Sequence, residues 1–484
     1  MTGTCDVWIS AADHARLMNH LYPGDRDEHG AVLRAGIVEA GNGLRLLVRD
    51  IALAEPGIDY VRGQYGYRAL KPTFIHKHIT GCRDERLAYL AVHNHDCDDW
   101  VDFSTIDLES HERGYPALRD IGKGVPVGAL VYGRRAVEGD IWLPDGARAR
   151  LGEYRIIGQS IARRTARPRT VDDGGGIYDR QVRMFGKAGQ DLLAEARVAI
   201  VGLGGVGSLV AEYAGRLGVG ELLLIDPDVI EDTNLSRVVG ATATDVEAAR
   251  LKTEIAARLI LTANPAAKVT QFPFDVLNAD AADALKSCDY IFLCADSMRA
   301  RLLVNAITHQ YFVPMVQLGA KIATDEAGAL SDAMSAVRSV RPGEGCLWCN
   351  GFIPSGTLAL EAKSDEDRKA QAYGTNEPNP SVITMNAVAA AQGINDFLFD
   401  FLGLREASGD WRYEHAHFLA RKTMKVVPHR EPECSECVRR YGRGDALGLP
   451  GVMARPVTAL TPKHGWLARW KEAVGAWFRR HPRT

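Results

Sequence analysis

The hydrophobic pattern is clearest between residues 197 and 226, where two apolar runs flank a glycine-rich turn. Val198–Val201 is an uninterrupted apolar run, which is typical of a strand buried in a parallel sheet. After the turn, Leu209–Leu217 is predicted to be a helix. A second apolar run, Leu222–Ile225, ends in Asp226. The pattern therefore predicts a strand–turn–helix–strand unit.

The turn itself predicts a nucleotide site. Glycines let the backbone approach a phosphate chain, and the N-terminus of the following helix offers free N–H groups to it. Asp226, 19 residues past the last glycine, is placed to hold a ribose hydroxyl. This pattern alone does not separate a nicotinamide cofactor from ATP. The glycines of the turn are Gly202, Gly204, Gly205 and Gly207.

Other strand-like runs lie upstream and predict a mixed α/β domain over residues 1–155. A polar, glycine-rich stretch at 156–176 is predicted to be a flexible linker, which would let two domains share one substrate. The nucleotide unit then belongs to a second α/β domain at 177–440, and 441–484 form a C-terminal tail. The upstream runs are Ala31–Leu33, Leu44–Val48, Ala88–Val92 and Val127–Tyr132.

Length and composition support this division into two domains and limit the expected cellular location of the protein. A chain of 484 residues is too long for one ordinary core. The net charge of −3 gives no case for nucleic-acid binding. The N-terminus has no basic-then-apolar signal and no run of 18 apolar residues occurs, so we expect a cytoplasmic protein without a transmembrane segment. Nine cysteines in such a chain indicate metal ligands or free thiols rather than disulfides.

A hydrolytic metal site is predicted in the first domain. Strand alternation puts His93 and His95 on one face, where both imidazoles can bind one metal ion. Asp107, at or near the start of the next helix, can add a carboxylate. Two histidines, one carboxylate and an open fourth position are typical of catalytic zinc, which lowers the pKa of its bound water to about 7. A His-rich surface loop with incidental acids is the alternative.

This segment resembles the JAB/JAMM (MPN-type) metalloprotease family, whose pattern is an upstream Glu, His-x-His, a spacer and Ser-x-x-Asp. The resemblance implies that His93, His95 and Asp107 bind zinc, that Glu28 activates the water, and that Ser104 stabilises the oxyanion. Family members cleave bonds next to ubiquitin-like proteins. The spacer is one residue longer here, and Asp96 replaces the usual Pro. Rival metal ligands are therefore Asp98, Asp99 and Asp102.

The second domain contains the charges that a triphosphate needs. Arg237 and Lys252 are cations for phosphates, and Lys252 is predicted to lie on a helix. A strand at Tyr290–Leu293 is followed by Asp296, at the end of a parallel strand where ligands bind and where a carboxylate can hold Mg²⁺. A nicotinamide enzyme does not need these two cations and a metal-binding carboxylate beside its glycine-rich turn.

The order of these motifs resembles the ThiF/MoeB/HesA family of ubiquitin-activating enzymes over about residues 177–440. Family members bind MgATP and adenylate the C-terminal Gly of a ubiquitin-like or sulfur-carrier protein. The resemblance implies a Rossmann-like adenylation domain in a homodimer, with Arg180 reaching the phosphates of the partner subunit. It also implies that Asp226 binds ribose and Asp296 binds Mg²⁺. The other residues expected to line the ATP site are Asp228, Asn234, Arg237 and Lys252.

Two Cys-x-x-Cys pairs predict a structural zinc site. Four thiolates in two knuckles are a common closed zinc site, and a clip of this kind occurs in the ThiF family. Four unrelated free thiols are the alternative. The ligands would be Cys346, Cys349, Cys434 and Cys437.

The segment between the zinc pairs is predicted to be a mobile crossover loop at 351–380, with a core helix after Pro380–Asn386. Residues 350–433 contain no cysteine. We therefore expect adenylation without a thioester between the carrier and a cysteine of the crossover loop. Cys288 and Cys294 flank a core strand and are expected to be buried. The other thiols are Cys5, Cys82 and Cys97, and the hydroxyls that could act instead are Ser355, Thr357, Thr375 and Ser381.

The tail contains apolar residues at helical spacing, with basic residues among them. Such a helix could dock on a partner or a membrane surface, or pack on its own protein or dimer mate. The apolar positions are Trp466, Trp470, Val474, Trp477 and Phe478.

The combined prediction is a bifunctional enzyme that trims a ubiquitin-like protein, or removes it from targets, and adenylates its C-terminal Gly. A bacterial conjugation pathway with a conjugating enzyme, linked to antiphage defence, is one setting. Activation of a sulfur carrier for cofactor or cysteine biosynthesis is a second. A non-catalytic scaffold that binds a ubiquitin-like protein is a third, against which the complete sets of acids and cations argue.

Overall fold

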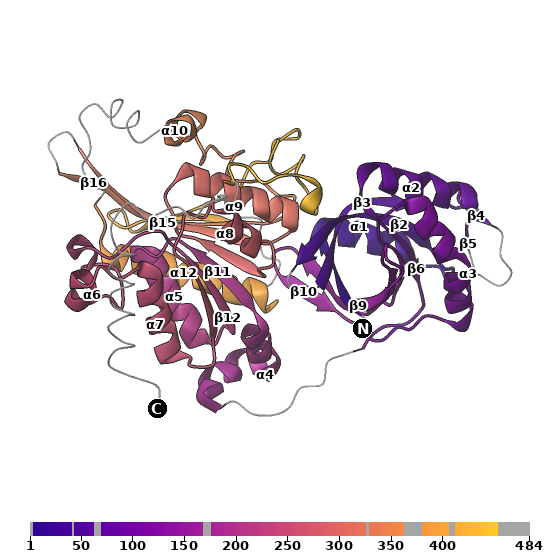
Figure 1. Cartoon of the computed structure of the whole chain (residues 1–484), viewed down its shortest axis with the longest axis horizontal. Helices are drawn as coiled ribbons and strands as arrows, with labels where there is room; N and C mark the ends of the chain where they lie inside the picture. Colours follow the sequence, from indigo (N-terminus) through magenta and orange to yellow (C-terminus); the bar gives the residue numbers. More distant parts are fainter. Residues whose placement is uncertain are drawn as a thin grey trace, which may run out of the picture.

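The computed structural model of the chain describes residues 3–40, 43–61, 69–167, 176–325, 329–362, 380–405 and 412–453. Two large sheets organise the described part, one near each end of the molecule (Figure 1). The predicted tail helix at 466–478 and Thr375 lie outside the described residues. No helix in the described ranges combines the length and apolarity needed to cross a bilayer.

The first sheet closes on itself. Its strand order is β1-β3-β2-β6-β7-β8-β9-β10, and β1 also pairs in parallel with β9. The ring is the barrel drawn in indigo and purple in Figure 1. Its strands are β1 (Thr4–Ser10), β2 (Gly30–Ala40), β3 (Gly43–Leu53), β6 (Ala88–Asn94), β7 (Val127–Tyr132), β8 (Val137–Trp142), β9 (Arg148–Ile157) and β10 (Ile161–Arg164).

Three helices and a short hairpin accompany the barrel. The helices are α1 (Ala11–Leu21), α2 (Pro72–Glu85) and α3 (Thr105–Gly122), and the hairpin is β4 (Tyr60–Val61) with β5 (Ala69–Leu70). The four strand-like runs predicted upstream lie within β2, β3, β6 and β7. The predicted linker at 156–176 begins inside β9, and β10 pairs with β9 between Ile161 and Arg164. Hydrogen-bonded strand therefore occupies the first part of that segment.

The second sheet has the strand order β13-β12-β11-β14-β15-β16-β17-β18. The first five strands run parallel and the last three antiparallel. The predicted strands at 198–201, 222–225 and 290–293 lie in three adjacent parallel strands. The strands are β11 (Arg197–Val201), β12 (Glu221–Ile225), β13 (Lys268–Phe272), β14 (Tyr290–Leu293), β15 (Met315–Thr324), β16 (Leu330–Val340), β17 (Tyr413–His417) and β18 (Lys422–Val426).

Helices cover both faces of this sheet, as the Rossmann-like prediction requires. Residues of α8 and α9 belong to the hydrophobic core on one face, and residues of α5, α7 and α12 to the core on the other. The helices are α4 (Asp179–Glu195), α5 (Gly205–Leu217), α6 (Ala243–Glu247), α7 (Lys252–Ala263), α8 (Ala279–Leu285), α9 (Met298–Tyr311), α10 (Ser355–Glu361) and α12 (Ile383–Phe401), and the 3-10 turns are η1 (Gly176–Tyr178), η2 (Asp232–Asn234) and η3 (Gly444–Ala446).

The barrel packs directly on the second domain. In β1, residues Cys5, Val7 and Ile9 face the barrel core, whereas Trp8 alternates outward into the core that contains α8 and α9. Val38 and Leu47 make the same outward contact from β2 and β3. Strand alternation thus places one face of these strands in each core, which explains why they are apolar on both faces.

The chain after the last cysteine pair is part of this junction. A Cβ at Gly36 of β2 would overlap the carbonyl oxygen of Gly442, so the two backbones are in contact. Arg49 donates to the carbonyl oxygen of Tyr441, and the Tyr441 hydroxyl donates to Asp13 at 2.6 Å. In Figure 1 this yellow segment lies beside α9, on the side of the barrel.

Buried charges also cross the junction. Arg155 of β9 pairs with Asp289 at 2.6 Å and with Glu153 at 2.6 Å. The guanidinium groups of Arg45 and Arg155 both lie over the indole ring of Trp8, 3.5 and 4.3 Å from its centroid. Burial alone would raise the pKa of Asp289, but the charge of Arg155 and the Arg197 amide outweigh it and hold this pKa below its ordinary value.

We expect Asp289→Asn to lower the free energy of unfolding by about 3 kcal/mol at neutral pH, because it removes one carboxylate from a buried arginine. Since the folded pKa of Asp289 is depressed, its contribution is present above the ordinary value of about 3.9 and lost as the pH falls through the folded value. Chemical denaturation should give a constant difference between pH 7 and pH 5 that shrinks below about pH 4.

The matched control is Asp99→Asn, which breaks an exposed pair with Arg135. It should leave the unfolding midpoint unchanged, because exposed ion pairs contribute little. Equal effects of the two substitutions would contradict the importance of the junction pair.

Candidate functional site

The glycine-rich turn lies at the C-terminal edge of the parallel strands. Gly202 has φ 88° and its amide donates to the carbonyl oxygen of Ile225, which joins the ends of β11 and β12. Added Cβ atoms would overlap the Gly202 carbonyl oxygen at Gly207 and the Asn386 side chain at Gly205. At Gly204 a Cβ would meet nothing within 4 Å. The turn is therefore tightly packed below and open at Gly204, as a phosphate cradle requires.

We expect Gly207→Ala to cost about 3 kcal/mol or more of unfolding free energy, because its Cβ would push β11 away from α5. Gly204→Ala is the control. Its φ of −73° suits alanine, and its Cβ faces open space. Thermal melts without ligand should show a large decrease for Gly207→Ala and little change for Gly204→Ala. Similar melts for both variants would show that the contact is not as tight as described.

The predicted ribose acid is fixed by backbone amides. The two carboxylate oxygens of Asp226 accept hydrogen bonds from the amides of Leu203 (2.6 Å) and Asp228 (2.9 Å). Asp226 is 5% exposed, and its burial raises its pKa. Each oxygen retains a second lone pair for a hydroxyl donor.

The predicted phosphate cations lie beside the turn on the α5–α7 side. Lys252 is the first residue of α7, and its ammonium pairs with Asp228 at 2.7 Å. Arg237 donates to the carbonyl oxygen of Thr233 at 2.7 Å and lies against Gly205. Asn234 is buried, and its side-chain oxygen has no hydrogen-bond partner among the described residues. The predicted helix over Lys252 begins only at this residue, since Ala249 has φ 45°.

Asp296 follows β14 and is exposed. No hydrogen bond or ion pair of its carboxylate occurs among the described residues. Ser297 caps α9 by accepting from the Ala300 amide at 3.1 Å. The amides of Met298 and Arg299 donate to the carboxylate of Glu361, at 2.9 and 3.0 Å. Asp296 is thus presented at the strand edge with its carboxylate available to a cation.

Arg180 lies at the exposed start of α4, and no contact between it and these groups occurs within the described residues. Asn386 of α12 was not predicted, although it packs against the Gly205 backbone and donates to Ser381 at 3.1 Å. An amide near the start of a mostly apolar helix was the available signal.

The barrel brings together the predicted zinc ligands. The Nε2 atoms of His93 and His95 are 3.3 Å apart, and Asp107 oxygens lie 3.4 and 3.5 Å from them. A tetrahedral zinc with bonds of about 2.05 Å would separate its ligand atoms by about 3.3 Å. These three residues form one of two groups with metal-ligand spacing within the described ranges. The geometry therefore fits zinc.

Glu28 lies at the same opening, with a carboxylate oxygen 4.0 Å from His95 Nε2. Burial raises the pKa of Glu28. Burial would also raise the pKa of Asp107, but hydrogen bonds from His93, His95 and Ser104 hold it well below its usual range. The hydrogen bond with Asp107 raises the pKa of His95.

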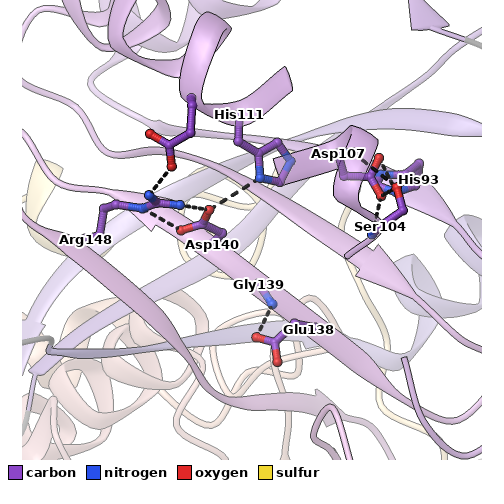
Figure 2. A network of polar contacts seen from close by, with 9 residues as sticks. His93, Ser104, Asp107, His111, Glu138, Gly139, Asp140 and Arg148 are labelled. Carbon is purple, nitrogen blue, oxygen red and sulfur yellow. Dashed lines mark hydrogen bonds and ion pairs between the residues drawn. The ribbon is translucent and has the colours of Figure 1, made fainter. Parts of the chain in front are cut away.

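Ser104 has a local structural role. It caps α3 by accepting from the Asp107 amide at 3.2 Å, while its hydroxyl donates to Asp107 at 2.7 Å. Figure 2 shows Ser104 and His93 beside Asp107, and His111 farther along the helix, pointing at Asp140. His111 and Asp140 are buried and 3.4 Å apart, which ties α3 to β8.

The rival acids lie in ion pairs with arginines. Asp98 is 3.5 Å from Arg134, and Asp99 is 2.6 Å from Arg135. Asp102 is 2.8 Å from Arg167. None of the three belongs to the metal-spaced group formed by His93, His95 and Asp107 in the described part of the chain.

The four predicted cysteines form the second metal-spaced group. Cys346 Sγ lies 3.5 Å from Cys349 Sγ and 3.9 Å from Cys434 Sγ, and Cys349 and Cys437 are 3.6 Å apart. A tetrahedral zinc with bonds of about 2.3 Å would separate its sulfurs by about 3.8 Å. Backbone amides of Cys349, Glu431 and Glu436 donate to these sulfurs, as they do around thiolates. The set fits a structural zinc ion.

Comparisons with known proteins agree with the prediction that the second domain is of the ThiF type. Ubiquitin-like modifier-activating enzyme 5 of Drosophila willistoni is 29% identical over 290 residues, which are 56% of this chain and 65% of that protein. The adenylyltransferase and sulfurtransferase UBA4 of Saccharomyces cerevisiae is 36% identical over 133 residues, 27% of this chain and 30% of that enzyme. This chain thus spans less than two thirds of both proteins.

A solved structure of E. coli MccB is 23% identical, covers 60% of this chain and 75% of that one, and has a TM-score of 0.44. Residues 178–436, more than half of the 484 residues, match the ThiF family. This chain belongs to the ThiF family.

Proposed function

We propose that this chain uses MgATP to adenylate the C-terminal carboxylate of a ubiquitin-like or sulfur-carrier protein. The main support is the set of groups at one edge of a parallel sheet in a ThiF-family domain. That set comprises the phosphate cradle, the buried acid Asp226, the cations Arg237 and Lys252, and the free carboxylate of Asp296. The two relatives, a ubiquitin-like modifier-activating enzyme and an adenylyltransferase and sulfurtransferase, are consistent with this activity.

The roles follow from position. Asp226 accepts from the ribose, and Asn234, Arg237 and Lys252 contact the phosphates, with Lys252 exchanging Asp228 for a phosphate oxygen. Asp296 holds Mg²⁺. The carrier's carboxylate then attacks the α-phosphorus, and pyrophosphate leaves. Arg180 completes the site from the second subunit of a homodimer.

ATP–pyrophosphate exchange tests this function directly. The full chain is mixed with a candidate ubiquitin-like carrier protein that ends in Gly, labelled pyrophosphate and MgATP. Label should enter ATP only when the carrier retains its terminal Gly, so the carrier truncated by one residue is the control. Absence of exchange with a carrier that binds would favour a non-catalytic scaffold.

The barrel supports a second activity, zinc-dependent hydrolysis next to the C-terminus of the same protein. The supporting observation is the spacing of His93, His95 and Asp107, which would hold a zinc ion, with a Glu28 oxygen 4.0 Å from His95 Nε2. Zinc would supply an activated water, and Glu28 would accept its proton. Ser104 would stabilise the oxyanion, although its hydroxyl donates to Asp107 here. Trimming would expose the Gly that the second domain activates.

His95→Ala is expected to reduce the zinc content from two ions to one per chain and to abolish cleavage of a carrier with a C-terminal extension. His76→Ala, at an exposed position of α2, is the control. Metal analysis and mass spectrometry of the carrier provide the two measurements. Full cleavage by His95→Ala would exclude this site, whereas pyrophosphate exchange should continue in both variants.

No thioester is proposed. Cys288 is fully buried, and burial raises its pKa to about 12, while burial raises the pKa of Cys294 still further. Thiols of this kind are poor nucleophiles. Ser355 and Thr357 on α10, or Ser381, remain candidate acceptors. A carrier adduct that thiols release would contradict this part of the proposal.

The genes next to the one that encodes this chain would identify the pathway. A conjugating-enzyme gene favours modification of proteins, with a role in antiphage defence as one setting. A sulfurtransferase gene favours sulfur transfer for cofactor or cysteine biosynthesis.

A further inference from the structure

Arg338 is a buried cation without an anion. It lies on β16, is 9% exposed, and has no carboxylate within ion-pair distance among the described residues. Its Nη1 donates to Gln317, its Nε donates to His415 at 3.1 Å, and its guanidinium stacks on Phe352, 3.9 Å from the ring centroid. All three partners are uncharged, since burial lowers the pKa of His415 to about 4. Its Nη2 has no hydrogen-bond partner within the described ranges.

A second arginine lies beside it. Arg301 of α9 donates from Nη1 to the carbonyl oxygen of Phe352 at 3.1 Å, and its buried Nε has no partner in the described part of the chain. Burial and the Arg301 charge together lower the pKa of Arg338 to about 10, so the two cations oppose each other. Buried charges are normally paired, because an unpaired charge is costly to desolvate. Neither guanidinium forms an ion pair with a carboxylate among the described residues, and Asp296 and Glu361 act on Arg301 only through their charge.

The pair lies on the face of the sheet opposite the one that carries the proposed phosphate cations. Arg338 is paired with Gln317 of β15 and Tyr413 of β17, and Tyr413 belongs to the core on the α8–α9 face. Lys252 lies at the start of α7 and Arg237 against Gly205 at the start of α5, helices that cover the other face. Arg301 follows Asp296 by five residues in the sequence, and the charge of Asp296 acts on Arg301. An anion bound by the arginines would thus approach Asp296 from the face away from the triphosphate.

We propose that Arg338 and Arg301 bind a carboxylate of the carrier's C-terminal tail. This inference rests on the proposed adenylation. The carboxylate is either the terminal one or an acidic side chain next to the terminal glycines, and its two oxygens accept from the unused guanidinium N–H groups. Carboxylates suit this site because guanidinium groups donate to both oxygens at once. A tail with no such group would bind poorly, which makes the pair a determinant of carrier specificity.

Four fluorescein-labelled decapeptides ending in Gly-Gly test the proposal with the full chain. Two have neutral side chains and two contain one Glu before the glycines, and each sequence is made with a free C-terminus and as a C-terminal amide. Fluorescence anisotropy should show at least about tenfold tighter binding of peptides with a carboxylate than of the neutral amide. If the Glu amide binds, the side chain is the ligand, and if only free C-termini bind, the terminal carboxylate is.

Arg338→Gln should reduce this preference to less than about twofold. Lys321→Gln, an exposed lysine on the same face of β15, should retain it. Arg338→Met is the second variant, because an apolar chain of similar length on Phe352 removes the charge with little risk to folding. Melting temperature and fluorescent ATP affinity should remain unchanged in all three variants.

The proposal is overturned if the four peptides bind alike, if none binds at 1 mM, if both Arg338 variants retain the preference, or if they lose ATP affinity instead. Pyrophosphate exchange separates the two proposals. Peptides that bind through Arg338 but support no exchange would count against adenylation and leave the carboxylate site standing. Exchange that is equal in wild type and Arg338→Met would count against the site and leave adenylation standing.

Discussion

Asp296→Asn is expected to decrease ATP–pyrophosphate exchange about 10³-fold, the largest effect of any single substitution in the second domain. The carboxylate lies at the end of β14 with no hydrogen bond or ion pair among the described residues, so it is available to Mg²⁺. Asparagine has the same shape but binds Mg²⁺ weakly, and charge on the departing pyrophosphate would then develop without compensation. Carrier binding should remain.

Asp232→Asn is the matched control, because Asp232 is an exposed acid of η2 with no assigned role. Exchange at a wild-type rate by Asp232→Asn and its loss in Asp296→Asn would locate the metal at β14. A decrease of less than about tenfold in Asp296→Asn would indicate that another acid holds the metal.

Cys437→Ser is expected to have the largest effect on stability. Zinc binding to four thiolates contributes on the order of 10 kcal/mol in small domains, comparable with the whole stability of an ordinary protein. The bound zinc should fall by one ion per chain, and the melting temperature should fall by about 10 °C or more. Ser435→Ala, within the same knuckle but without a metal-ligand atom, should melt like wild type.

The loss of stability in Cys437→Ser should extend to the barrel. Tyr441 and Gly442, a few residues past Cys437, contact Asp13, Gly36 and Arg49 of the first domain. Hydrogen exchange should therefore show faster exchange at β2 and β3 in Cys437→Ser. Protection of these strands equal to that in wild type would mean that the knuckle does not support the junction.

Local patterns predicted the parts of this molecule that are continuous in sequence. The two apolar runs on either side of the turn at Gly202 form adjacent strands, as predicted. The two-residue spacing of His93 and His95 places both imidazoles on one face of a strand, as strand alternation requires. Short motifs also predicted that Asp107 lies beside the two histidines and that the two cysteine pairs come together, because metal ligands require particular residue types at particular distances.

Long-range packing was not predictable in the same way. The pairing of β1 with β9 closes the barrel across more than 140 residues, and no periodicity within either strand indicates it. Likewise, the outward positions of Trp8 and Leu47 resembled ordinary core positions, so a second domain beneath them was not foreseen. Arg338 resembles any strand arginine until the uncharged groups around it are known.

The packing of Tyr441–Gly444 against β2 and β3 has a consequence for biosynthesis. The barrel strands are complete at Arg164, but α8 and α9, which share a core with the outward-facing residues, follow about 115–150 residues later, and Tyr441–Gly444 follow only about 280 residues later, roughly 15–60 s at usual elongation rates. Until α8 and α9 have been translated, Trp8, Val38 and Leu47 face solvent on the ribosome-bound chain. The nascent protein therefore exposes a hydrophobic, aggregation-prone surface that chaperones would have to cover. For the same reason a gene fragment ending near residue 167 should produce insoluble barrel.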